Sequence, residues 1–404
     1  MSAPRVLVVG MGIAGLATAL RLREIGWEPL VVERAPERRA AGYFVGFLEA
    51  GRAAAQRLGV LDAIGNRSDP DTAMYNVNRS GGNRRPGMGY NDLPGNVRII
   101  LRGDVEGALY PRVASATEIR YGTSPVAIDE HADGVDVTLR TTVGEDTTEL
   151  TERFDLVVGA DGMRSTVRSL VFGPDATYMR PFNHIIAVTL LKEQVPGFRP
   201  NDGLTIAEHG RSAWVIPFAD RTPAVLMSYR TDDEDAQFRR PPIEALRAGF
   251  GPEPTGPILE HLFAQYEAAD ERLFDSVHQV DMPTWHTDRV VLVGDSAWCL
   301  TLFSGMGVSM GLGGSDLLGT TLARNPGNIG RALREWEQHL RPFVAEHQRD
   351  ARTTGLSLFV PQTRRGLVTR RVVTTATGNK VGKRAMQALL TTTMKEKMID
   401  VAAP

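Results

Sequence analysis

Short runs of consecutive apolar residues recur along the chain and predict the strands of a buried sheet. They occupy residues 6–9, 30–32, 156–158 and 290–293, and each run is followed by a glycine or an acidic residue. Continuous apolar runs of this length are typical of parallel strands covered on both faces by helices. The first run precedes a rough apolar stripe at helical spacing, which ends at Gly26. The pattern therefore predicts an α/β fold.

Other segments predict a second, antiparallel sheet. Residues 187–191, 212–218 and 224–229 have the composition of strands and are bounded by Pro, Gly and Asp, whereas the acidic run 231–235 predicts a solvated loop. One face of such a sheet would line an apolar pocket. The candidate walls of this pocket are the aromatic residues Trp214, Phe218 and Tyr229.

A glycine-rich turn after the first apolar run carries the strongest chemical signal. Gly10 allows a tight turn, Gly12 leaves room for a pyrophosphate, and Gly15 lets the following helix pack close to the sheet. Ile13 and Ala14 begin that helix, whose free backbone N–H groups would bind the phosphates. The turn predicts a nucleotide site.

An acidic residue supports this interpretation. Glu33 closes the second strand, 18 residues after Gly15, close to the spacing of an acid that binds the hydroxyls of an adenosine ribose. Strand, glycine turn, helix, strand and acid follow one another in the order of a dinucleotide-binding βαβ unit. We therefore predict that residues 6–33 bind a dinucleotide.

Two further strands deliver an aspartate at the edge where ligands bind in open α/β folds. They end at Asp161 and at the pair Gly294 and Asp295. An aspartate after a strand is commonly only a helix cap, and either site alone favours that interpretation. Three such strand ends in one chain favour a ligand site. A helix predicted to run to about residue 322 begins beside them, and its leading residues Gly305, Gly307 and Val308 are further candidates.

In their order, these motifs resemble the FAD-dependent monooxygenases of the para-hydroxybenzoate hydroxylase class, the group A flavoprotein monooxygenases, which include tetracycline-inactivating and polyketide-tailoring branches. The resemblance implies that Glu33 binds the adenosine ribose of FAD and that Asp295 binds the ribityl chain. It implies that Asp161 braces the nucleotide loop and is linked to the use of a pyridine nucleotide. The implied cofactors are non-covalent FAD and, as a transient co-substrate, NADPH or NADH.

The resemblance also implies a fold and a division of the chain. The fold is a Rossmann-like FAD-binding domain of the glutathione-reductase type, with an inserted antiparallel-sheet substrate domain and C-terminal helices. We expect the FAD-binding domain to comprise residues 1–70, 97–175 and 281–355. The substrate domain would comprise 71–96 and 176–280, and the C-terminal helical segment 356–404.

Further site residues follow from the resemblance. Arg102 corresponds to an arginine that leads a helix beside the flavin, although a solvated helix-terminal arginine is the plainer alternative. Arg34, directly after Glu33, is expected to contact the adenine. Residues 41–43 resemble a loop that lets the flavin ring approach the backbone. The amides at the start of the helix after residue 304 would face the flavin pyrimidine and stabilise the anionic reduced ring.

The sequence departs from the family pattern after Asp295. Trp298 stands where the family usually has histidine, and Leu302 stands where a proline is common. We expect both residues to make the substrate side of the flavin bulkier and more apolar. A dry pocket suits a flavin C4a-hydroperoxide that transfers one oxygen atom to an apolar or aromatic, natural-product-like molecule. The alternative is a non-redox cyclase or isomerase in which FAD only shapes the pocket.

The composition of the chain limits the kinds of partner that it can bind. The 404-residue chain has a net charge of −2, which argues against a general nucleic-acid surface. Its one cysteine excludes an internal disulfide and a multi-cysteine metal site, so no metal is expected. No apolar run suggests a membrane span, and we expect a cytoplasmic enzyme whose partners are a small-molecule substrate and O2. Nine basic residues after position 360 predict a solvated face or, alternatively, a dock for an acyl carrier protein.

Overall fold

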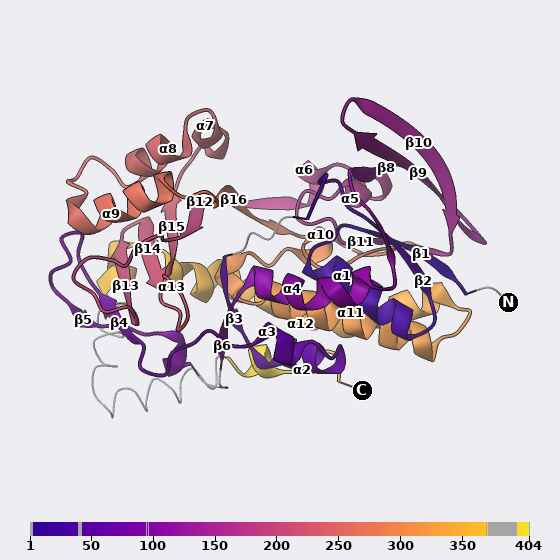
Figure 1. The fold of residues 1–404 in the computed structure, drawn as a ribbon, viewed down its shortest axis with the longest axis horizontal. Helices are drawn as coiled ribbons and strands as arrows, with labels where there is room; N and C mark the ends of the chain where they lie inside the picture. Colours follow the sequence, from indigo (N-terminus) through magenta and orange to yellow (C-terminus); the bar gives the residue numbers. More distant parts are fainter. Residues whose placement is uncertain are drawn as a thin grey trace.

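A five-stranded parallel sheet forms the centre of one half of the molecule in the computed structural model (Figure 1). The structure describes residues 3–38, 43–93, 95, 97–368, 370 and 394–403. The strand order is β17 (Val290–Leu292), β11 (Leu156–Gly159), β1 (Arg5–Val9), β2 (Glu28–Val32) and β7 (Glu118–Arg120). The apolar runs thus form adjacent parallel strands, as predicted, because each run is buried on both faces.

Helices and a small antiparallel sheet cover this parallel sheet. The small sheet contains β8 (Thr123–His131), β9 (Gly134–Val143) and β10 (Asp146–Phe154). The helices of this half are α1 (Ile13–Glu24), α2 (Glu49–Arg57), α3 (Leu61–Ile64), α4 (Arg102–Ala114), α5 (Thr166–Val171), α6 (Asp175–Tyr178), α10 (Asp295–Trp298), α11 (Gly307–Arg324) and α12 (Ile329–Asp350). The side chains between these layers form one continuous apolar core.

A seven-stranded sheet forms the other half of the molecule. Its order is β16 (Arg272–Val280), β12 (Met179–Leu190), β15 (Ala224–Arg230), β14 (Arg211–Ile216), β13 (Asp202–Glu208), β4 (Ala73–Asn76) and β5 (Arg85–Pro86). Neighbouring strands are antiparallel except β13 and β4, which are parallel, so the sheet is mixed at that pair rather than wholly antiparallel. The acidic run 231–235 is not only a loop, because Asp233 caps a short helix there.

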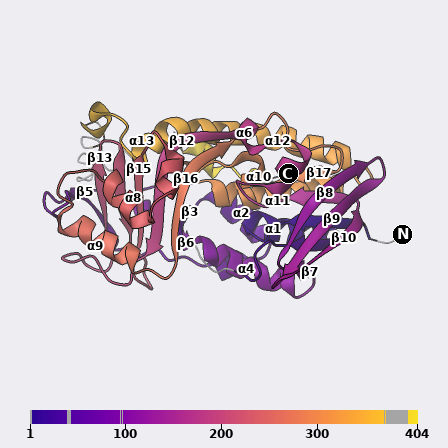
Figure 2. The same ribbon diagram turned by 90° about the horizontal axis from the view of Figure 1, so that it is seen from above.

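The two faces of the seven-stranded sheet are covered by different parts of the chain. The outer face packs against α7 (Glu234–Phe238), α8 (Pro242–Gly249) and α9 (Gly256–Glu267). The inner face packs against a two-stranded ribbon, β3 (Phe44–Phe47) with β6 (Arg98–Leu101), and both views place this ribbon between the two large sheets (Figures 1 and 2). We call this side of the sheet, together with what packs on it, the apolar face.

The C-terminal part of the chain lies against both halves. It contains the π-helical turn Ala351–Gly355, α13 (Leu356–Phe359) and the 3₁₀ turn Lys395–Met398. Elsewhere in the chain, the 3₁₀ turn Tyr90–Asp92 comes before β6. The predicted acyl-carrier-protein dock finds no support here, because Lys397 is ion-paired and Arg370 lies over Trp214, while Arg371, Lys380, Lys383 and Arg384 lie outside the described residues. Within the described ranges, no helix is both long and apolar enough to cross a membrane.

Candidate functional site

The motif residues of the parallel strands meet at one edge of the sheet. The register pairs Val9 with Val32 on one side and with Gly159 on the other, and Gly159 with Leu292. The four strands therefore end at the same level, and the residues that follow them lie side by side. These residues are Gly10, Glu33, Asp161, Gly294 and Asp295.

Two glycines of the first turn are required by close backbone packing. Gly10 has a φ of 102°, and a Cβ there would lie 2.5 Å from the carbonyl oxygen of Ala160. A Cβ on Gly15 would lie 1.9 Å from the carbonyl oxygen of Gly10. The backbones of β1, α1 and the loop after β11 thus approach each other more closely than any side chain allows. This is the close helix–sheet contact that the motif predicts.

The third glycine faces an arginine instead of the backbone. Of the described residues, a Cβ on Gly12 would meet only the Nη2 atom of Arg102, at 3.4 Å. Arg102 is the first residue of α4, and its guanidinium also contacts Glu106 at 3.0 Å. Gly12 is the N-cap of α1 and supplies no side-chain hydrogen bond to it. The start of α1, at Ile13 and Ala14, therefore combines unpaired N–H groups with a nearby cation, which suits a phosphate.

Glu33 braces the same turn. Its carboxylate accepts a hydrogen bond from the Met11 amide at 3.0 Å and another from the Ala35 amide at 2.9 Å. The side chain is half-buried, whereas Arg34 beside it is exposed. Glu33 thus fixes the loops after β1 and β2 relative to one another, and its position at the edge remains accessible to a ribose.

Asp161 acts as a helix cap. Its carboxylate accepts hydrogen bonds from the amides of Thr166 and Val167, at 2.7 and 3.1 Å, and from the Ser165 hydroxyl at 2.5 Å. Burial raises the pKa of this carboxyl, while these hydrogen bonds oppose the change. The cap holds the Asp161 backbone against Gly10, where a Cβ would lie 2.8 Å from the Asp161 Cα. Asp161 therefore braces the glycine turn through its backbone.

Asp295 remains accessible at the same edge. Gly294, with a φ of 71°, turns the chain so that α10 begins at Asp295. The side chain is exposed although its chain neighbours are buried. The surrounding protein raises the pKa of this carboxyl by desolvation, and Arg102 opposes the change. A Cβ on Gly294 would lie 2.9 Å from the Ala14 Cβ, so the third motif directly adjoins the start of α1.

A second helix begins here without a cap. Among the residues that the structure describes, no side chain caps α11, and no atom lies within 4 Å of a Cβ built on Gly305 or Gly307. The Gly305 amide is not free, however, because it donates to the Leu302 carbonyl at 3.0 Å. The open amides of this helix therefore begin at Gly307 and Val308, two residues later than the segment predicted from the sequence.

The edge as a whole suits FAD. Two uncapped helix N-termini, α1 and α11, direct partial positive charge to it, and Arg102 adds a full charge. The open space at Gly12, Gly305 and Gly307 admits an extended ligand close to the backbone. An exposed Asp295 and a half-buried Glu33 supply acceptors for ribityl and ribose hydroxyls. The residues present therefore fit a dinucleotide with a pyrophosphate at its centre.

Three of the predicted pocket residues lie together on the apolar face. Trp214 and Phe218 belong to the same buried cluster, and Leu302, half-buried in the loop before α11, packs against it. Trp214 is covered by the C-terminal part of the chain, since its Nε1 donates to the Phe359 carbonyl at 3.2 Å. We call the sheet edge that carries Gly10, Glu33, Asp161, Gly294 and Asp295 the nucleotide edge. Of the three pocket residues, Leu302 is the one that joins the apolar face to this edge.

Tyr229 does not share the apolar face with Trp214 and Phe218, so its prediction as a third wall of the same pocket is wrong. It points to the outer face of the sheet, where it packs in the cluster under α8 and α9. Its hydroxyl donates to Gln237 at 3.0 Å, and a Cβ on Gly249 would lie 2.4 Å from its ring. The sheet itself therefore lies between Tyr229 and the nucleotide edge.

Trp298 was also wrongly placed. It is 1% exposed and packs between Trp285 and Trp336, with ring centroids 4.9 and 5.8 Å away. Its ring fits against Gly314 of α11, where a Cβ would lie 3.0 Å away. Trp298 thus fills the core beneath the site and does not shape a substrate pocket. The cyclase alternative was suggested by two residues that depart from the family pattern, Trp298 and Leu302. Only Leu302 faces the apolar side, so Trp298 no longer supports that alternative.

Several contributors to the site carried no recognisable signal in the sequence. Arg168 is fully buried and donates to the carbonyls of Met163 and Ser296, which ties the loop after β11 to α10. Phe303 and Phe359 pack together, with centroids 5.8 Å apart, across the apolar face. Their contacts join segments far apart in the chain, so only the folded structure reveals them.

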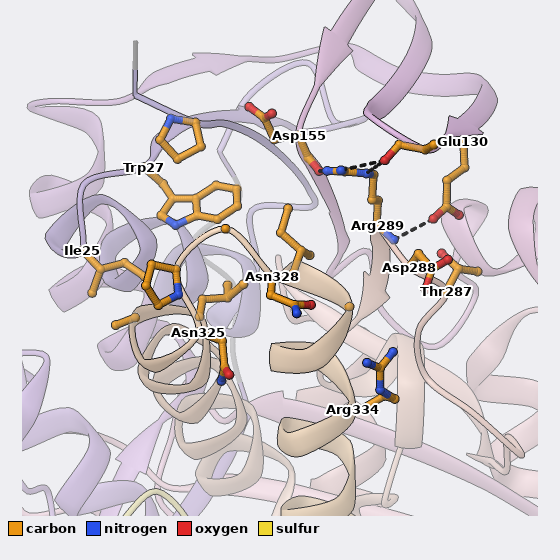
Figure 3. Close-up of a pocket in the computed structure, with 18 of the residues that line it drawn as sticks. Ile25, Trp27, Glu130, Asp155, Thr287, Asp288, Arg289, Asn325, Asn328 and Arg334 are labelled. Carbon is orange, nitrogen blue, oxygen red and sulfur yellow. Dashed lines mark hydrogen bonds between the residues drawn. The ribbon is translucent and has the colours of Figure 1, made fainter. Parts of the chain in front are cut away.

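A large cavity lies at the opposite edge of the parallel sheet (Figure 3). It has a volume of about 1270 Å³ and is lined by residues that precede the strands, among them Trp27, Asp155 and Arg289. Its lining mixes the carboxylates of Asp155, Asp288 and Glu130 with the guanidinium groups of Arg289 and Arg334, so it offers no net positive charge to a pyrophosphate. The glycine turn and the uncapped helices face away from this cavity, so it is not the nucleotide site.

Comparisons with known proteins identify the family. A family model described as an FAD binding domain matches residues 4–332. The chain therefore belongs to this family and is a flavoprotein that binds FAD. It is 28% identical to an FAD-dependent monooxygenase of Sarocladium schorii over 88% of each chain. It is 25% identical to a flavin-dependent monooxygenase of Legionella longbeachae, over 85% of this chain and 87% of that one.

Solved structures share the fold. The tetracycline destructase Tet(55) superposes with a TM-score of 0.74 at 22% identity, covering 94% of this chain and 97% of the other. Klebsiella pneumoniae HpxO, solved with FAD and uric acid, superposes with a TM-score of 0.72 at 17% identity, covering 96% of each chain. At these identities the likeness shows the common architecture, which is the predicted FAD-binding fold with a substrate sheet.

Proposed function

We propose that this member of the FAD-binding family transfers one oxygen atom from O2 to an apolar or aromatic small molecule, with NADPH or NADH as the reductant. The observation that carries the proposal is the junction at Leu302. This residue packs on the apolar face, and five residues later α11 begins with the open amides of the nucleotide edge. One short loop thus joins a cofactor site to an apolar surface.

FAD, when bound, supplies the electron transfer and the oxygen activation. The chain's own residues hold and polarise it. Gly12 and the start of α1 would admit the pyrophosphate, and Glu33 and Asp295 would accept hydrogen bonds from the ribose and ribityl hydroxyls. The open amides of Gly307 and Val308 would place the positive end of α11 beside the bound ring. This field favours negative charge on the ring and so favours its reduction.

The apolar face determines the class of substrate. Half-buried side chains at its rim, including Tyr43, Phe182 and Leu302, offer apolar and aromatic surface next to the loop. Such a surface excludes water from the reacting oxygen and binds a ring compound by burial and ring contacts. Of the solved structures named above, one is a tetracycline destructase and the other holds uric acid, and both of these small molecules are ring compounds, which supports a ring substrate here.

The surface near Asp161 supports the use of a nicotinamide. Arg164, three residues later, is half-exposed and bonds to Asp275 of β16 at 2.7 Å. This ion pair bridges the two halves of the molecule beside the nucleotide edge. We propose that Arg164 releases Asp275 when the reductant binds and then contacts a phosphate or ribose of the reductant.

Isotopic labelling tests the proposal. The FAD-loaded protein is supplied with NADPH or NADH and a panel of aromatic compounds under labelled O2. We expect one compound to accelerate NAD(P)H oxidation and to gain one labelled oxygen atom. Product with the substrate's own mass, formed under nitrogen without a nicotinamide, would instead establish the cyclase alternative.

A further inference from the structure

The last residues that the structure describes lie against the helix that begins at the nucleotide edge. Val401 and Ala402 are buried in the core of this half, at 0% and 4% exposure. A Cβ on Gly313 of α11 would lie 2.7 Å from the Val401 Cγ2, so the helix has a small residue where Val401 packs. The carbonyl of Val401 accepts a hydrogen bond from His339 Nε2 at 3.0 Å. We call residues 394–403 the C-terminal strap.

An ion-pair cluster anchors the strap independently of the loop before α11. Arg57 of α2 binds both carboxylate oxygens of Asp400, at 2.6 and 2.8 Å. The same guanidinium binds Asp316 of α11 at 2.5 Å, and Arg21 of α1 binds Asp316 at 3.1 Å. Bidentate arginine pairs of this kind hold a fixed geometry. The strap therefore keeps its place even if a contact at its other end is lost.

At that other end, Lys397 reaches the loop before α11. Its ammonium donates to the Ser304 carbonyl at 2.9 Å and pairs with Asp350 of α12 at 2.7 Å. The side chain is only 16% exposed. The largely buried ammonium of Lys397 therefore makes charge-assisted hydrogen bonds to the Asp350 carboxylate and the Ser304 carbonyl, and such bonds are stronger than neutral ones.

The Ser304 peptide is thereby held from both ends. Its carbonyl accepts from Lys397, and the N–H of the same peptide, on Gly305, donates to Leu302 at 3.0 Å. The Ser304 hydroxyl accepts from the Met306 amide at 3.0 Å. Thr301, which begins the loop, has a φ of 65°, a conformation that a threonine seldom adopts without support. The loop is thus shaped by contacts rather than by local preference.

We propose that Lys397 is a positioning residue for the flavin. It fixes the Ser304–Gly305 peptide, so that the amides of Gly307 and Val308 face the cofactor. Its charge also adds to the positive field at the start of α11. The inference rests on FAD binding at this edge, and it assigns a role in cofactor affinity and reduction to the distant end of the chain.

The surroundings of Lys397 support this role. His347 of α12 is 1% exposed, and its Nε2 has no hydrogen-bond partner within the described part of the chain. Burial and the nearby Lys397 lower the pKa of this imidazole to about 4. The histidine therefore stays neutral, and Lys397 with Asp350 forms the charged pair at this point. A second cation beside Lys397 would weaken its hold on the loop.

Variants at the two lysines of the 3₁₀ turn test the proposal. Lys397→Met removes the donor, Lys397→Arg keeps the charge, and Lys395→Met is the matched control because the Lys395 side chain is exposed. Three quantities are measured on each protein. They are amide hydrogen exchange of residues 301–309 without FAD, the dissociation constant of FAD, and the midpoint potential of the bound flavin.

In Lys397→Met we expect faster hydrogen exchange at the loop amides, about tenfold weaker FAD binding and a lower midpoint potential of the bound flavin. Lys397→Arg should recover most of the affinity, and Lys395→Met should match the parent protein. Unchanged affinity and potential in Lys397→Met, or equal losses in Lys395→Met, would overturn the proposal. If the parent protein itself bound FAD elsewhere, the proposed function would fail rather than the role of Lys397 alone.

Discussion

The nucleotide edge and the apolar face differ in how the chain encodes them. At the edge, each residue acts within a short sequence motif: Gly10 turns the strand, Gly15 lets the helix approach, and Asp161 caps the next helix. On the apolar face, strands from distant parts of the chain contribute alternate side chains to one cluster. Trp214 and Tyr229 lie on adjacent strands, yet they face opposite sides of the sheet. Local motifs therefore specify the cofactor site, and tertiary packing specifies the substrate side.

The largest effect should come from the edge. Gly15→Ala places a Cβ 1.9 Å from the Gly10 carbonyl oxygen, so α1 must move away from β1. We expect a loss of about 3 kcal/mol or more in the free energy of unfolding, measured by denaturant titration, with loss of FAD binding. The matched control is Gly107→Ala in α4, where the nearest atom is 3.8 Å away and alanine should be neutral or stabilising. Equal stability of the Gly15 variant and the parent would refute the close contact.

Acid should destabilise the half that contains the edge, through His347. An unfolded histidine takes up a proton near pH 6.5, whereas His347 resists protonation down to about pH 4. The unfolded chain binds more protons in this window, so the free energy of unfolding falls as the pH decreases from 6.5 to 4. The loss is up to about 3 kcal/mol.

The measurement is the free energy of unfolding as a function of pH for the parent and for His347→Leu. The variant should show a flatter decline over this window. The same substitution at the exposed His131 serves as the control. Parallel curves for the parent and His347→Leu would show that the buried imidazole does not control the acid response.

Asp295→Ala should separate cofactor binding from folding. The side chain is exposed, and Arg102 is its main opposite charge, so its removal should leave the apoprotein about as stable as the parent. FAD affinity should fall by about 1.5–3 kcal/mol, because a charge-assisted hydrogen bond to the ribityl chain is lost. Asp288→Ala, at the cavity of the opposite edge, should leave affinity unchanged. Full FAD occupancy at limiting cofactor in Asp295→Ala would remove this residue from the site.

The smallest effects should distinguish the two faces of the seven-stranded sheet. Leu302→Ala removes half-buried apolar surface beside the loop and should raise KM for the substrate by about five- to thirtyfold, or 1–2 kcal/mol. Tyr229→Phe breaks the hydrogen bond to Gln237 on the outer face and should cost about 1 kcal/mol of stability with KM unchanged. A KM effect from Tyr229 together with none from Leu302 would reverse the assignment of the faces.

The sequence was sufficient for the parallel sheet and for the convergence of its three motifs. Apolar runs and glycine spacing act through neighbouring residues, so they can be interpreted without the fold. The substrate side was harder to predict, because strands buried on both faces lack a clear alternation: β14 and β15 are almost wholly buried. Trp298 was misplaced because a family position does not show whether its side chain points to the cofactor or into the core.

The most direct test of the account is a crystal structure of the protein with FAD bound. We predict the adenosine at Glu33, the pyrophosphate at Gly12 and the start of α1, and the ribityl chain at Asp295. The flavin ring would lie beside Gly307 and Val308, with its other side toward Leu302 and the apolar face. FAD bound in the cavity at the opposite edge of the parallel sheet, or a flavin ring directed away from the apolar face, would contradict the account.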